Sequence, residues 1–149
     1  MKAQRRRLAD RLRWYWRLQS RIDAFQVRWL GTSLLALMRR STALVLETTG
    51  RRTGRPHGTT VMYWTEGDQT FIGGGAAGMS KVDWVANLRA DPRCAVWVRR
   101  RRSEAEAHEL RGDAYDKAKA YAFARWPAAS RFEAGSGRRI PYFRLEKLP

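Results

Sequence analysis

From Thr42 onward the chain reads as short strand-like segments joined by short connections. Consecutive strands joined by short turns pair antiparallel, and the stretches that could form helices are too few to cross between parallel strands. The sequence therefore predicts a mainly β domain with flanking helices, built as a small antiparallel barrel or sandwich. The expected strands cover residues 42–49, 58–65, 70–74, 93–99, 103–111 and 140–146.

Two helices are expected between these strands. Ser80 is a favourable N-cap residue and Asp83 follows three positions later, so a capping box opens a helix over residues 81–90. The spacing in that helix places Trp84, Asn87 and Leu88 on one face. The second helix, over residues 114–126, ends before a proline, and its core stripe is expected to be Ala114, Ala118, Tyr121 and Arg125.

The charge of the chain predicts an anionic partner. Its 149 residues suffice for one domain, and 30 Lys and Arg residues against 14 Asp and Glu residues give a net charge of +16. A phosphorylated cofactor, an anionic membrane surface and a nucleic acid all fit this balance. The run Arg99–Arg102 would serve a nucleic-acid binder, but we favour a solvated hairpin tip, because no nucleic-acid-binding motif accompanies it.

Residues 1–40 form an N-terminal extension ahead of a barrel domain over residues 41–149. A helix is expected over residues 5–30, because Leu8, Leu12, Tyr15, Ile22, Phe25 and Trp29 recur at three- and four-residue steps among arginines. Such a basic amphipathic helix either packs on its own domain or lies in an anionic membrane interface. We expect no signal peptide and no transmembrane span, and hence a cytoplasmic protein, peripheral at the inner membrane face in the second case.

The connection Thr48–Pro56 concentrates positive charge at one bend. Two glycines permit positive φ there, and Arg51, Arg52 and Arg55 add three fixed cations. Backbone N–H groups and guanidinium groups at such a loop can bind a phosphate or a carboxylate. An ordinary charged hairpin tip is the alternative.

A second glycine cluster, Gly73 to Gly75, leaves a strand and leads toward the capped helix. Small residues leave room for a flat ring or a phosphate close to the backbone. The cluster lacks the context of a dinucleotide-binding fingerprint and the residue order of a P-loop.

Other chemistries find little support in the sequence. The only histidines are His57 and His108, and the single cysteine, Cys94, sits in an apolar segment that predicts burial, so no metal site is expected. No catalytic triad with recognisable context occurs. If the protein is an enzyme, a cofactor carries the chemistry.

Four segments together resemble the deazaflavin-dependent nitroreductase family, whose members are oxidoreductases that use coenzyme F(420). They lie in the expected order over residues 43–148: Leu44–Pro56, Gly73–Gly75, Asp83–Pro92 and Arg139–Phe143. The resemblance implies a split β-barrel related to the flavin-binding, pyridoxamine-phosphate-oxidase-like fold. It also implies hydride transfer from the reduced deazaflavin to a quinone-like or nitroaromatic acceptor.

The resemblance assigns a cofactor site residue by residue. Arg51, Arg52 and Arg55 would bind the phosphate and the acidic tail of the cofactor, with His57 as a weaker basic contact. Lys81 matches a basic position of the family approximately. The groove for the ring and phosphate would be lined by Val61, Met62, Ile72, Gly73, Gly74, Gly75, Trp84 and Asn87.

One departure from the family concerns the acceptor. Better-known members carry tyrosines in the loop after the second helix, where this chain has Phe132 and alanines. Phe132 keeps a stacking surface without the hydroxyl, so quinone reduction, with solvent or Ser130 supplying protons, is favoured over nitro reduction.

Two alternative functions follow from the same residues. One is a non-catalytic binding protein of this fold for a fatty acid, a flavin or another anionic ligand; FMN fits the residues less well than F(420). The other is a basic nucleic-acid-binding protein, which charge alone supports. The sequence leaves the oligomeric state open.

Overall fold

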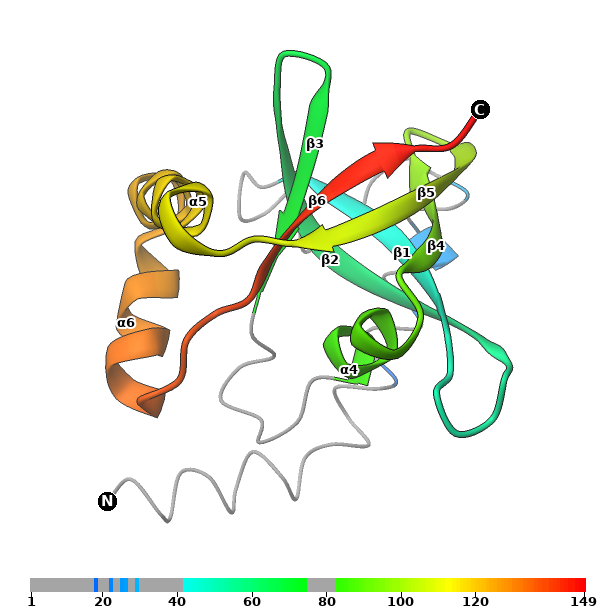
Figure 1. The fold of residues 1–149 in the computed structure, drawn as a ribbon, viewed down its shortest axis with the longest axis horizontal. Coiled ribbons are helices and arrows are strands. Elements are labelled where there is room, and N and C mark those ends of the chain that lie inside the picture. Colours follow the sequence, from blue (N-terminus) through cyan, green and yellow to red (C-terminus); the bar gives the residue numbers. More distant parts are fainter. Residues whose placement is uncertain (1–17, 19–21, 23–24, 27–28, 30–41, 75–82) are drawn as a thin grey trace.

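The computed structural model describes residues 18, 22, 25–26, 29, 42–74 and 83–149. These residues form a closed antiparallel barrel with three helices outside it (Figure 1). The expected mainly β fold with flanking helices is therefore confirmed. The strands are β1 (Ala43–Thr49), β2 (Pro56–Glu66), β3 (Gln69–Gly73), β4 (Arg93–Val98), β5 (Arg101–Glu109) and β6 (Tyr142–Lys147); the helices are α4 (Asp83–Ala90), α5 (Gly112–Arg125) and α6 (Pro127–Ser136).

The strands follow the order β1-β2-β3-β6-β5-β4, and β1 closes the barrel by pairing with β4. All six neighbouring pairs are antiparallel. Three pairs are hairpins, whereas β6 arrives from the distant C-terminal segment and inserts between β3 and β5. The C-terminal strand β6 therefore lies between β3, which ends at Gly73, and β5, which precedes α5.

The barrel interior is filled by the protein's own side chains. Leu44, Leu46, Ile72 and Phe143 are among its members, each at most 1% exposed. Helix α4 closes one end of the barrel, because Trp84, Val85 and Leu88 join the same cluster. The predicted shared face of Trp84, Asn87 and Leu88 is confirmed, since all three are buried.

A second apolar cluster lies on the outer face of β2, β3 and β6. There α5 and α6 pack against the barrel wall (Figure 1), and Trp64, Phe71 and Tyr142 from the strands meet Tyr115 and Ala118 from α5. Trp64 is the centre of this cluster, because its ring contacts those of four neighbours at centroid distances of 5.3 to 6.0 Å. The two clusters use opposite faces of the same strands.

Two helical predictions were wrong in detail. The segment after Trp126, expected as a loop, is helix α6, and Pro127 begins it. Proline is favoured in the first turn of a helix, where its missing N–H has no partner to lose. The predicted core stripe of the preceding helix is correct at Ala118 only; the other buried residues of α5 are Tyr115 and Ala122.

The arginine run was placed only partly correctly. Arg99 and Arg100 form the two-residue turn between β4 and β5 and have φ values of 45° and 70°. Arg101 and Arg102 belong to β5, and Arg102 pairs with Glu47 and Glu104. Half of the run is thus a hairpin tip, and the rest is strand.

Most of the predicted N-terminal helix lies outside the described residues, as does the predicted cap Ser80. The five described residues of the extension are all helical. Among them Leu18, Ile22, Phe25 and Trp29 follow one another at steps of four, three and four residues, so they share one face. All four side chains are exposed, by 49%, 45%, 64% and 61%.

Gly73 has a specific packing role at the end of β3. It lies between Met62 and Tyr142 in the sheet, and a Cβ atom at this position would lie 2.2 Å from Cδ1 of Tyr142. The Tyr142 ring therefore rests directly on the backbone of β3. The glycine that the sequence indicated as room for a flat ring accommodates a ring of the protein itself.

We predict that Gly73→Ala lowers the free energy of unfolding by about 1–3 kcal/mol, because the new methyl group overlaps the Tyr142 ring. Gly135→Ala is the matched control: Gly135 lies in α6 with open space around its Cα, so alanine raises helix stability by about 0.5–1 kcal/mol. Urea unfolding measures both. Equal effects of the two substitutions would contradict the packing role of Gly73.

Candidate functional site

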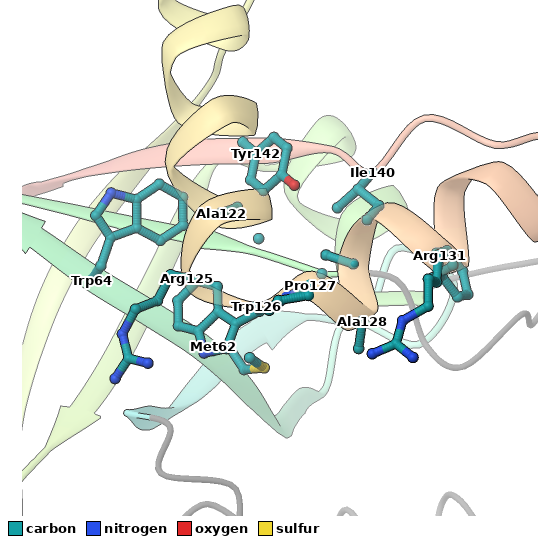
Figure 2. A pocket seen from close by; sticks show the side chains of 14 residues that line it. Met62, Trp64, Ala122, Arg125, Trp126, Pro127, Ala128, Arg131, Ile140 and Tyr142 are labelled. Carbon is teal, nitrogen blue, oxygen red and sulfur yellow. The ribbon is translucent and has the colours of Figure 1, made fainter.

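A cavity of about 640 Å³ lies between the outer face of the barrel and the two helices α5 and α6 (Figure 2). Strands β2, β3 and β6 supply one wall, and the helices supply the other. The lining is mainly apolar and aromatic, a composition typical of pockets that bind flat organic molecules. The lining residues are Met62, Trp64, Gly73, Gly74, Ala122, Arg125, Trp126, Pro127, Ala128, Ala129, Arg131, Phe132, Ile140 and Tyr142.

Two hydrogen-bonding groups in this lining have no partner among the described residues. They are the hydroxyl of Tyr142 and the indole Nε1 of Trp126, both of which are buried. Tyr142 is 2% exposed, and burial is the main reason that the pKa of its phenol lies above the ordinary value, with Tyr115 and Glu133 adding to the effect. The hydroxyl is therefore a neutral donor throughout the physiological pH range.

Four of the residues predicted from the sequence lie together at this cavity: Met62, Gly73, Gly74 and Phe132. They come from the β2–β3 hairpin and from α6, so the fold brings together two segments that are distant in sequence. Sequence reasoning missed Trp64, Trp126 and Tyr142. The alternation of β2 offered a signal for Trp64, which shares a strand face with Met62.

Three other predicted residues contribute their side chains to the barrel interior instead. Val61, Ile72 and Trp84 belong to the cluster that fills the barrel. Val61 and Ile72 alternate with Met62 and Gly73 along β2 and β3, so they face the opposite side of the sheet from the cavity.

Arg51 and Asn87 hold the β1–β2 loop to helix α4. The side-chain oxygen of Asn87 accepts hydrogen bonds from the backbone N–H of Arg51 at 3.2 Å and from its guanidinium at 3.0 Å. Asn87 also donates to Thr48 at 3.1 Å, and the guanidinium pairs with Asp83 at 3.3 Å. Asn87 is 4% exposed, so this network satisfies a buried amide and fixes the loop.

Arg52 and Arg55, by contrast, are exposed on the same loop and form no ion pair with any described residue. The loop beneath them is closed by backbone hydrogen bonds, such as the one from Gly50 N–H to the Arg55 carbonyl at 2.8 Å. The His57 ring lies 3.2 Å from the Thr53 hydroxyl and packs over Gly50. The loop thus presents two cations on a preformed backbone.

The remaining predicted residues take no part in the described cavity lining. Ser130 donates its hydroxyl to the Pro127 carbonyl at 2.9 Å, a bond within the first turn of α6. Gly75 and Lys81 lie outside the described residues. Cys94 is buried as predicted, and burial raises the pKa of its thiol to about 12, so it is not a nucleophile. No group of His, Cys, Asp and Glu side chains in the described part of the chain has the arrangement of a metal site.

The cationic loop and the cavity lie along one strand, with the loop at the start of β2 and the cavity farther along it. Pro56 begins β2 beside the loop and Met62 lines the cavity, which corresponds to about 20 Å along an extended strand. A ligand that contacts both must be long, acidic at one end and flat at the other.

The closed antiparallel barrel agrees with the class of fold that the resemblance implies, a split β-barrel related to the pyridoxamine-phosphate-oxidase-like fold. Within that class, residues 9–147 match the sequence profile of the F(420)H(2)-dependent quinone reductase family. The chain belongs to this family. It is an F(420)-dependent oxidoreductase, and coenzyme F(420) is its cofactor.

Solved structures with low sequence identity share the fold. An F(420)-H(2)-dependent reductase, FDR-A, matches with a TM-score of 0.63 and 22% identity over 70% of this chain and 94% of its own. A chain described as a domain-swapped dimer matches with the same score and identity over 70% and 80%. A putative pyridoxamine 5′-phosphate oxidase from Listeria innocua matches with a TM-score of 0.53 and 11% identity over 78% and 91%. No curated protein matches the chain.

Proposed function

We propose that the protein reduces a quinone with hydride from reduced F(420), and that the acceptor binds in the cavity between the barrel and α5–α6. The observation that supports this most directly is the cavity itself. Its aromatic walls and two buried neutral donors suit a flat, uncharged, oxygen-bearing molecule.

The residues of the chain fit the cofactor. Arg52 and Arg55 offer unpaired guanidinium groups for a phosphate and an acidic tail, while Arg51 keeps their loop in place. Met62 and Gly74 in the cavity lining offer surface for the ring, whereas Gly73 is covered by Tyr142. The reduced deazaflavin, when bound, supplies a hydride, and the protein contributes binding, orientation and exclusion of water.

A quinone fits this cavity better than a nitro compound because the lining offers few hydrogen-bond donors. Reduction of a quinone to its hydroquinone consumes one hydride from F(420)H(2) and one proton from solvent, whereas reduction of a nitro group also breaks an N–O bond and releases the oxygen as water. At the position where better-known members of the family carry tyrosine, Phe132 provides a stacking surface without a hydroxyl. The cavity therefore offers contact with a flat ring and only a few donors.

We also propose that the N-terminal helix rests on an anionic membrane surface. The exposed face formed by Leu18, Ile22, Phe25 and Trp29 is apolar, and the rings of Phe25 and Trp29 lie 6.0 Å apart. Arginines are interspersed among these residues in the sequence, which suits lipid phosphates. In the part of the chain that the structure describes, no helix is long and apolar enough to cross a membrane. Contact with the surface would bring the site near lipid-soluble quinones.

The double variant Arg52→Ala with Arg55→Ala is expected to weaken binding of oxidised F(420) at least roughly tenfold, because two charge-assisted hydrogen bonds are lost. Its stability should stay within about 0.5 kcal/mol of the wild type, since both side chains are exposed. Arg51→Ala should instead cost about 0.5–1.5 kcal/mol, because the Asn87 oxygen loses the guanidinium as a donor and keeps only the backbone N–H of residue 51. Calorimetry and urea unfolding measure the two quantities. Unchanged F(420) binding by the double variant would contradict the role of the loop.

Oxidation of F(420)H(2) by menadione tests the acceptor class directly, with a nitroimidazole as the comparison. We expect the wild type to prefer the quinone. Phe132→Tyr should shift the ratio of kcat/KM values toward the nitro compound by roughly 3- to 10-fold, the contribution of one added hydrogen bond. Phe123→Tyr, in the same cluster but outside the cavity lining, is the control. A wild type that reduces no quinone while oxidising F(420)H(2) with nitro compounds would refute the proposed acceptor.

Flotation with liposomes tests the membrane contact. Phe25→Glu with Trp29→Glu should abolish most recovery with vesicles that contain anionic lipid, because charged side chains replace the exposed apolar face. Gln69→Glu with Leu148→Glu changes the net charge equally at other exposed positions and should float like the wild type. Equal recovery of both double variants would exclude the helix as the contact.

A further inference from the structure

We propose that the hydroxyl of Tyr142 and the indole N–H of Trp126 are the donors that hold carbonyl oxygens of the flat ligand in the cavity. This inference rests on the proposed function, because it names the groups that recognise the ligand. It goes further by assigning recognition to a strand residue, Tyr142 of β6, and to the residue at the junction of α5 and α6.

The first observation is that both donors are buried without a partner among the described residues. Buried polar groups are nearly always hydrogen-bonded, because leaving one unpaired loses the bonds it made to water. A ligand that accepts hydrogen bonds from both groups would explain why two such donors lie in the lining of one cavity. Other polar groups of the same cluster are satisfied: Tyr115 donates to the Ile140 carbonyl at 3.1 Å, and Trp64 donates to Glu66 at 3.2 Å.

The second observation is that the Tyr142 ring is fixed in place. The Cδ1–Cε1 edge of the ring lies against Gly73, and the rings of Tyr115 and Trp64 lie at centroid distances of 5.7 and 6.0 Å. In Figure 2 its oxygen points toward Ile140, another residue of the cavity lining. A ring held on several sides cannot turn its hydroxyl to a partner elsewhere, so the hydroxyl is preorganised for a ligand.

The third observation concerns the chemistry of the lining. It contains no acidic side chain, and its two arginines, Arg125 and Arg131, are exposed. The groups that are buried are neutral donors in an apolar surround, which favours a neutral acceptor such as a carbonyl oxygen over an anion.

Two molecules carry suitable carbonyl oxygens, the quinone acceptor and the ring of the cofactor. The experiment therefore titrates three probes separately into protein without cofactor: menadione, 2-methylnaphthalene, which lacks the carbonyl groups, and oxidised F(420). Isothermal titration calorimetry gives each affinity. Tyr142→Phe should weaken the binding of one carbonyl probe by roughly 3- to 10-fold and leave 2-methylnaphthalene unchanged. The carbonyl probe that responds identifies the source.

A second readout separates a binding role from a structural one. Removing an unpaired buried hydroxyl relieves a cost, so Tyr142→Phe should raise the Tm of the ligand-free protein by about 2 to 4 °C. Tyr115→Phe is the matched control: its hydroxyl has a protein partner, so its loss should lower the Tm and leave the preference for carbonyl probes intact.

The outcomes distinguish this inference from the proposed function. If Tyr142→Phe lowers the Tm and all three affinities keep their wild-type values, a bound water or the protein itself satisfies the hydroxyl, and the inference is overturned. If menadione binds poorly to the wild type while F(420) binding depends on Tyr142, the donor role stands and the proposed acceptor site does not. If menadione binds and is reduced without any dependence on Tyr142, the proposed acceptor site stands and the donor role of Tyr142 is overturned.

Discussion

The filling of the barrel interior determines where this protein can bind anything. Each strand sends alternate side chains inward, and Leu44, Leu46, Ile72 and Phe143 leave no exposed surface there. Helix α4 closes one end of the barrel with Trp84. A ligand must therefore lie outside the barrel, on the face that β2, β3 and β6 share with α5 and α6, and the cavity is found at that face.

The three arginines of the β1–β2 loop differ in their contacts. The Arg51 guanidinium pairs with Asp83 and donates a hydrogen bond to Asn87, so it fixes the loop to α4. Arg52 and Arg55 keep theirs exposed. Because α4 is also the element that closes the barrel, the geometry of the cationic loop and the integrity of the core depend on one helix.

Much of this architecture could be predicted from the sequence, since alternation and turn residues determine the six strands to within a few residues. What could not be predicted are choices that depend on three-dimensional packing. In the sequence Arg51 cannot be distinguished from Arg52 and Arg55, because its hydrogen bond to the buried amide of Asn87 forms only in the folded chain. Along β6, Phe143 and Leu145 alternate with Arg144 and Glu146, which indicates that Phe143 faces the interior, but nothing in the sequence shows that α5 and α6 cover the opposite face at Tyr142. A proline after a helical segment indicates the end of that helix, but Pro127 also begins a second helix, α6, which the sequence pattern did not predict.

The contact between Gly73 and Tyr142 also constrains how such a chain can change over evolutionary time. The two positions are about seventy residues apart in sequence and adjacent in the sheet, and the ring fits only over a residue without a side chain. A substitution at either position therefore changes what the other position tolerates, and the effects of the two substitutions on stability should not be additive.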